Sequence, residues 1–177
     1  NLIAVGAFEV NYVKLFQNED DGWKERKKIN GATGSHFGVS VALSSEGSRL
    51  VVGAHLAFGN YIQSGSVYLY ALFPRSELQR IDGEYHDRFG RSVTMSSDGS
   101  LVAAGTYNEG YVKVYKAVDA SLERYDHVGD RLRGPYGSSF GESVSLSSDG
   151  RGLVVGAPLT LDSVDGCSDC GKVSIFY

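Results

Sequence analysis

The sequence lacks several features, and each absence excludes a class of protein. It has no basic surplus, because 17 Lys and Arg stand against 21 Asp and Glu, and this argues against a nucleic-acid binder. No apolar run approaches the length of about 18 residues that a membrane-spanning helix needs. Two cysteines are too few for a structural zinc site made of two Cys pairs. A charged leader followed by an apolar stretch is also missing, so we expect any signal peptide to lie outside this segment.

Glycine, in contrast, is abundant. The chain has 23 glycines in 177 residues, roughly twice the usual share. Only three prolines accompany them and no Gly-X-Y period is present, which indicates many tight turns between short strands. Hydrophobic residues make up 42% of the chain and are spread throughout it, which excludes a disordered chain. The length predicts one domain.

An internal repeat dominates the chain. A segment that begins with Phe-Gly and ends with Asp-Gly or Glu-Gly occurs three times, at residues 37–47, 89–99 and 140–150. The phenylalanines are 52 and 51 residues apart. An apolar run of the type Leu-Val-Val-Gly-Ala follows each copy, and residues 2–7 hold one more such run. Such regular self-similarity is typical of repeat architectures.

Two further elements complete each period. One alternates as Val-x-Leu-Tyr, at residues 13–16, 67–70, 112–115 and 173–176. Glycine stands two residues before three of these copies, and Asn11 takes that place in the first. The other element is weaker and ends at Gly31, Gly83 and Gly134, each six residues before the next Phe-Gly.

The periodicity of these elements predicts an all-β fold with almost no helix. Ser-Val-x-Leu-Ser alternates with a period of two, as in a strand with one buried face. We expect the acidic residue and the glycine after it to supply two positive-φ positions of a tight hairpin turn. The run Leu-Val-Val-Gly-Ala reads as an inner strand covered on both faces, and the charge-rich segment 23–29 as an exposed outer strand. Each period is therefore a four-stranded antiparallel blade of a β-propeller.

The order of these motifs resembles the FG-GAP repeat, which builds the seven-bladed propeller of integrin α subunits and of many secreted microbial surface proteins. The resemblance implies a partial blade at residues 1–31, repeats at 32–83 and 84–134, and a partial repeat at 135–177. The fourteen expected strands make about 3.5 blades, too few for a closed ring. We interpret the chain as an excerpt of a longer propeller, of seven blades by the resemblance, or as an arc that another chain completes.

The loop at residues 158–171 carries the chemistry that the resemblance predicts. In FG-GAP propellers this loop often holds calcium through the pattern Asp-x-Asp-x-Asp-Gly-x-x-Asp. Asp165 and Asp169 match that pattern, Leu161 and Ser163 depart from it, and Asp162 stands one place away. Calcium favours such oxygen ligands, so these aspartates are a candidate calcium site. The alternative is a polar loop whose aspartates cap its own turns.

Cys167 and Cys170 form a Cys-x-x-Cys in the same loop. We favour a local disulfide, which would fit an oxidising, extracellular setting. Two free thiols in a reducing compartment are the alternative.

Three other groups of residues resemble functional sites but also have structural interpretations. Residues 137–141 match the Gly-x-Ser-x-Gly of serine hydrolases, but that motif needs a strand-to-helix turn and no helix pattern follows. The histidines show no metal-ligand spacing and are interpreted as solvated loop residues; they are His36, His55, His86 and His127. Three tyrosines fall in loops between the second and third strands of a repeat, where they contact a glycan or protein partner or pack over neighbouring blades; they are Tyr61, Tyr107 and Tyr111.

Two functions follow from these patterns. The first is a non-catalytic segment for interaction, adhesion or structural assembly at the cell surface or outside the cell, with a protein partner, a glycan or further copies of the chain. The second is part of a carbohydrate-binding or hydrolytic propeller whose site lies mostly outside this segment.

Overall fold

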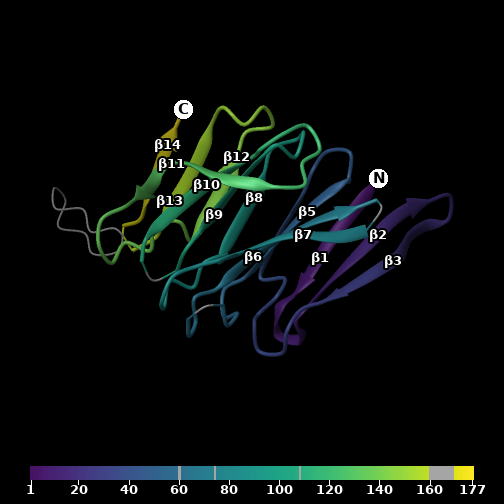
Figure 1. Ribbon diagram of the computed structural model, residues 1–177, viewed down its shortest axis with the longest axis horizontal. Helices are drawn as coiled ribbons and strands as arrows, with labels where there is room; N and C mark the ends of the chain where they lie inside the picture. The colour runs from purple at the N-terminus through teal and green to yellow at the C-terminus, as the bar shows by residue number, and fades with distance from the viewer. Residues whose placement is uncertain (60, 74, 108, 160–169) are drawn as a thin grey trace.

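The computed structural model describes residues 1–59, 61–73, 75–107, 109–159 and 170–177. These residues form fourteen strands, grouped in four antiparallel sheets, and one short 3₁₀ helix. The sheets stand next to one another in chain order and form an open arc, with the two termini in the end sheets (Figure 1). The predicted all-β fold of blade-like sheets is therefore confirmed, and no sheet closes the arc within the described residues. None of the described residues forms a helix that is long and apolar enough to cross a membrane.

Each sheet is a meander in which neighbours in the chain pair with each other. The first sheet contains β1 (Leu2–Ala7), β2 (Tyr12–Glu19) and β3 (Gly22–Asn30), with the 3₁₀ helix η1 (Phe8–Val10) between β1 and β2. The second contains β4 (Ser40–Leu43), β5 (Arg49–Ala54), β6 (Ser66–Leu72) and β7 (Arg75–Asp82). The third contains β8 (Ser92–Met95), β9 (Leu101–Gly105), β10 (Tyr111–Ala117) and β11 (Tyr125–Arg133). The fourth contains β12 (Ser143–Leu146), β13 (Leu153–Ala157) and β14 (Lys172–Phe176).

The core lies between the sheets rather than within them. Three hydrophobic clusters are present, one at each junction of neighbouring sheets. The phenylalanine of each Phe-Gly is almost fully buried in one of these clusters: Phe37, Phe89 and Phe140. The glycine six residues earlier leaves space for this ring, because a Cβ on Gly134 would lie 2.3 Å from the Cβ of Phe140. The repeat motif therefore encodes the packing of one blade on the next.

The prediction that Leu-Val-Val-Gly-Ala is covered on both faces holds only in the middle of the arc. Strands β5 and β9 are buried along almost their whole length. Strands β1 and β13 instead alternate, because each lies in an end sheet with one face uncovered. Ile3, Val5 and Val154 are exposed on these faces.

The predicted tight turn with two positive-φ residues is wrong. In the turn Ser96–Gly99 only the glycine has a positive φ, of 77°. The Gly99 amide donates to the Ser96 carbonyl at 3.0 Å, which closes a four-residue turn. The Asp98 carboxylate accepts from the Ser96 hydroxyl at 2.6 Å and from the Ser100 amide at 2.9 Å. The acidic residue thus caps the turn with its side chain and does not need the left-handed backbone.

Glycines also bring neighbouring sheets into close contact. A Cβ on Gly53 of β5 would lie 2.0 Å from the carbonyl oxygen of Gly90, which precedes β8 in the next sheet. The Ser40 hydroxyl donates to the same carbonyl at 3.2 Å. The equivalent Ser92 hydroxyl donates to the Gly141 carbonyl at 2.7 Å. Backbones of successive blades can approach this closely only where no side chain intervenes.

Candidate functional site

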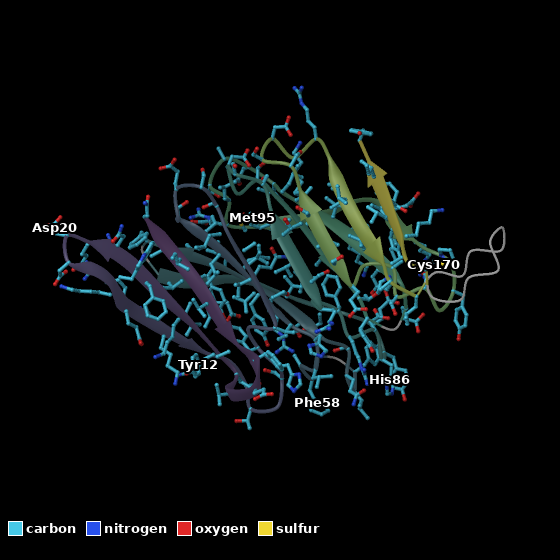
Figure 2. All side chains as sticks on the ribbon, turned by 180° about the vertical axis from the view of Figure 1, so that it is seen from behind. Tyr12, Asp20, Phe58, His86, Met95 and Cys170 are labelled. Carbon is cyan, nitrogen blue, oxygen red and sulfur yellow. The ribbon has the colours of Figure 1, made fainter. Side chains whose placement is uncertain are left out.

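The loops that vary most between repeats gather at one end of the sheets. They are the loops after the second strand of each repeat and those before each Phe-Gly, and we call this the loop end. Figure 2 shows Phe58 and His86 at this end, and Met95, the last residue of β8, at the opposite end. The residue before each phenylalanine has a positive φ: His36 at 54°, Arg88 at 52° and Ser139 at 53°. The repeat fixes this unusual backbone in all three copies, while the side chain that it presents changes.

Hydrogen bonds hold the loops of neighbouring repeats together. The His36 amide donates to the Asn11 side-chain oxygen at 2.8 Å. Further along, the Phe89 amide donates to the Ser64 carbonyl at 2.9 Å, and the Arg88 amide to the Gln63 carbonyl at 3.2 Å. These bonds cross from one repeat to the next, so the side chains at the loop end are presented on a fixed frame.

One pocket at the loop end, which we call the basic pocket, has a volume of about 300 Å³. Its lining comes from three successive repeats: Phe8, His36, His55, Arg88, Arg91 and Tyr107. The rings of His36 and His55 meet edge to face, with centroids 5.0 Å apart. The guanidinium carbons of Arg88 and Arg91 lie 5.5 and 5.6 Å from the centroid of Tyr107.

The electrostatics of this pocket disfavour further positive charge. The pKa of His55 is lowered to about 4, first by burial and then by His36, Arg91 and Arg88. His55 is therefore neutral at pH 7. The Arg91 side chain donates to the Glu142 carboxylate at 3.2 Å, and that of Arg88 to the neutral Gln63 amide oxygen at 3.4 Å.

A second pocket at the same end, the acidic pocket, has a volume of about 530 Å³. Its lining combines tyrosines with carboxylates: Tyr61, Glu84, Tyr85, Asp87 and Glu109. Glu84 pairs with Arg131 and, at 3.7 Å, with Lys113. Asp87 accepts hydrogen bonds from the Tyr111 hydroxyl and the Glu84 amide. Burial raises the pKa of Asp87 from its ordinary value, although the bond from Tyr111 opposes the shift.

Large apolar side chains are exposed on the two loops that carry Tyr61 and Tyr85 of the acidic pocket. We call them the aromatic patch, which consists of Phe58, Tyr61, Ile62 and Tyr85, each more than half exposed. The His86 amide donates to the Ile62 carbonyl at 3.3 Å, so the two loops that carry the patch are joined.

The three candidate tyrosines have different environments. Tyr61 is exposed, as predicted for a contact residue, and Tyr107 is half-buried in the basic pocket. The prediction is wrong for Tyr111, which is the first residue of β10 and is fully buried. Its hydroxyl donates to Asp87, and burial raises its pKa. Tyr111 therefore has the packing role that the sequence left as an alternative.

Most of the candidate calcium and disulfide residues lie outside the part of the chain that the structure describes. Asp162, Asp165, Asp169 and Cys167 lie outside the described residues, and only Cys170 lies within them. Both sites stay predictions. Within the described ranges, no group of three acidic, His or Cys side chains could hold a metal ion.

His36 and His55 lie in loops, as predicted, but they are half-buried: both line the basic pocket, and their Nδ1 atoms are buried. Sequence reasoning also missed Arg88 and Arg91 as site residues. The signal that could have found them is disagreement between aligned repeats, because the positions around Phe-Gly vary while Phe-Gly itself does not.

Comparisons with known proteins agree with this architecture. Residues 23–70, from β3 to β6, match the family model described as FG-GAP repeat. A crystal structure of a functionally unknown protein from Desulfotomaculum acetoxidans DSM 771 is similar over 97% of this chain, with a TM-score of 0.56 and 12% identity. This chain covers 66% of that protein, and at this identity the likeness shows the fold alone. A search of curated proteins finds no match. Residues 23–70 therefore match an FG-GAP repeat, and the blade-like antiparallel sheets of the chain fit a partial propeller.

Proposed function

We propose that this chain is a non-catalytic interaction module of an extracellular or cell-surface protein, and that it binds a protein partner through its loop end. The aromatic patch is the observation that carries the proposal. FG-GAP repeats support an interaction role, and the patch provides the surface for it. Exposed aromatic side chains gathered on fixed loops are typical of binding surfaces.

The chemistry around the patch indicates what kind of partner fits. Phe58 is 68% exposed and Tyr85 is 61% exposed, so both can bury apolar area on binding. Glu109 lines the acidic pocket beside them. A partner segment with apolar side chains and a Lys or Arg would complement both features, since tyrosines at interfaces combine apolar contact with a hydroxyl.

The experiment places a photo-crosslinking phenylalanine analogue at Tyr85 in the full-length protein on its native cells. The matched control places it at Trp23 of β3, which is 47% exposed but far from the loop end. We expect one defined crosslinked protein from position 85 and none from position 23. The Tyr61→Ala substitution should reduce the yield at position 85. Equal crosslinking at both positions, or none at 85, would contradict the proposal.

Carbohydrate binding is a second candidate, favoured by the pairing of Tyr61 and Tyr85 with carboxylates in one pocket. Aromatic rings can stack on sugar rings while carboxylates accept from their hydroxyls. A glycan array decides between the two, because a glycan signal that Tyr85→Ala removes would replace the protein partner as the ligand.

We also propose that further blades, of the same protein or of another copy, cover the two end sheets. Val173 and Ile175 of β14 are 64% and 57% exposed, and Val5 of β1 is 48% exposed. The corresponding faces between the described sheets are buried in the core clusters.

A further inference from the structure

We propose that the basic pocket binds a tetrahedral oxyanion, the sulfate or phosphate group of a ligand. The proposal does not depend on the aromatic patch or on its partner, because the pocket has its own lining and can be tested with inorganic ions alone.

The first argument is uncompensated charge. Arg88 and Arg91 both lie close to the ring of Tyr107, so two cations line the same pocket. Glu142 compensates Arg91 at 3.2 Å. No ion pair to Arg88 is found among the described residues, and its guanidinium donates to the neutral Gln63. Like charges in one pocket repel each other, and a bound anion would relieve that repulsion.

The second argument is a set of polar atoms without partners. Seven buried side-chain nitrogen and oxygen atoms lack a hydrogen bond in the described part of the chain, and four of them belong to this pocket. They are His36 Nδ1, His55 Nδ1, Arg88 Nε and Arg91 Nε. Unpaired buried polar groups are costly, and functional sites are one place where they are retained.

The shape of the lining favours a tetrahedral ion over a carboxylate. The four side chains come from the loop 31–39, the residue after β5 and the residues on either side of Phe89-Gly90. Three separate segments therefore line the pocket. Sulfate and phosphate present oxygens in four directions, whereas a carboxylate presents two in one plane, and arginine forks match these oxygens well.

His55 links binding to protons. The charged and titratable groups that face it are His36, Arg88 and Arg91, with Glu142 beyond Arg91. Burial and the nearby arginine cations favour the neutral imidazole of His55, while an anion in the pocket would favour its imidazolium form. By linkage, the affinity for the anion should rise as the pH falls toward the pKa that His55 has in the empty pocket. The full gain in affinity is about tenfold for each unit by which the bound anion raises the pKa of His55.

The test is calorimetric titration of the protein with sodium sulfate at constant ionic strength in chloride. We expect saturable binding to one site at pH 7, tighter binding at pH 5, and a sulfate-dependent shift of the His55 ring signals in NMR spectra. Inorganic phosphate should compete with sulfate. Glucose 6-sulfate distinguishes the source of the group, because an ester that binds more tightly than the free ion identifies a sulfated ligand, and equal binding identifies the ion itself.

Matched variants assign the site. Arg88→Gln should weaken sulfate binding by about tenfold or more, as for loss of a charge-assisted hydrogen bond. Arg151→Gln removes an 89% exposed arginine side chain in the turn before β13 and should bind like the parent. His55→Gln should remove the difference between the sulfate affinities at pH 5 and pH 7, a second readout that covers the case in which Arg88→Gln does not fold. No saturable sulfate binding, or equal losses in the variants at 88 and 151, would overturn the proposal.

Discussion

Replacing Gly53 by alanine tests the close contact between blades. Gly53 is not a positive-φ position, so alanine fits its backbone and by itself would add about 0.5–1 kcal/mol of stability. The new Cβ, however, would stand 2.0 Å from the Gly90 carbonyl oxygen and 3.0 Å from its carbon. These atoms are backbone of the next sheet, so the two sheets must separate by roughly 1.5 Å to reach ordinary contact.

Such overpacking costs about 1–3 kcal/mol or more. We take the upper end of that range, because β5 is buried on both faces and the Ser40 bond to Gly90 is lost as well. After subtracting the gain from alanine, the free energy of unfolding should fall by about 2 kcal/mol. For a chain of this length, that lowers Tm by about 4–8 °C.

Gly156→Ala is the matched control. Gly156 holds the same repeat position in β13, and a Cβ there would meet the Ser143 hydroxyl at 2.3 Å but no other atom within 3.5 Å. Gly53 has the corresponding serine hydroxyl at 2.4 Å, so the pair isolates the contribution of the neighbouring backbone. In the 177-residue chain, Gly156→Ala should change the free energy of unfolding by about 0.5 kcal/mol or less. Thermal and urea unfolding measure both variants. A Gly53→Ala protein as stable as the parent, or equal losses in the two variants, would refute the reasoning.

Three further predictions concern the core, a turn and the cysteines. Phe89→Ala should cost about 3–5 kcal/mol in urea unfolding, because the ring is 1% exposed between two sheets. Asp98→Ala should lower Tm at pH 7. The hydrogen bonds from Ser96 and Ser100 lower the pKa of Asp98 below its ordinary value of 3.8. The stability that Asp98 contributes is therefore present above pH 3.8 and lost as the pH falls below it, so the Tm values of the parent and the variant should converge in acid. Iodoacetamide should label Cys167 and Cys170 only after reduction, and labelling of the untreated protein would exclude the predicted disulfide.

Most of the fold could be predicted because the repeat reports the same packing several times. Phe89 and its counterparts mark the junctions between blades, and Asn11 takes the left-handed position, at φ 55°, that glycine occupies in the other copies. The turn geometry could not be derived in this way. The dipeptide Asp98-Gly99 fits either a two-residue hairpin turn or a capped four-residue turn, and the choice depends on the hydroxyl of Ser96.

The environment of Tyr111 could not be predicted for a different reason. Its sequence neighbours suggest a loop, but the residue begins β10, where its hydroxyl contacts Asp87 of the same repeat and its ring packs in the cluster shared with the preceding sheet. Residues 24 positions apart share no local pattern that would reveal such a pair. The same limit applies to Arg88 and Arg91, which meet Tyr107 only once β8 and β9 of their repeat are paired.

The repeat also explains why the basic pocket stands where it does. Phe8, His55 and Tyr107 occupy one repeat position, the second after the glycine of the apolar run, and His36 and Arg88 occupy another, immediately before the phenylalanine. Arg91 holds the variable position directly after Phe-Gly. Every residue that lines the pocket therefore comes from a position where the copies differ, next to glycine or phenylalanine that packing keeps the same. Since the invariant residues fix the backbone and the variable ones face the pocket, changes at these positions can alter ligand chemistry with little effect on the fold. Arg88→Ser, which introduces the residue that the third copy has at this position, should thus weaken sulfate binding by about tenfold or more while Tm in chloride stays close to that of the parent protein.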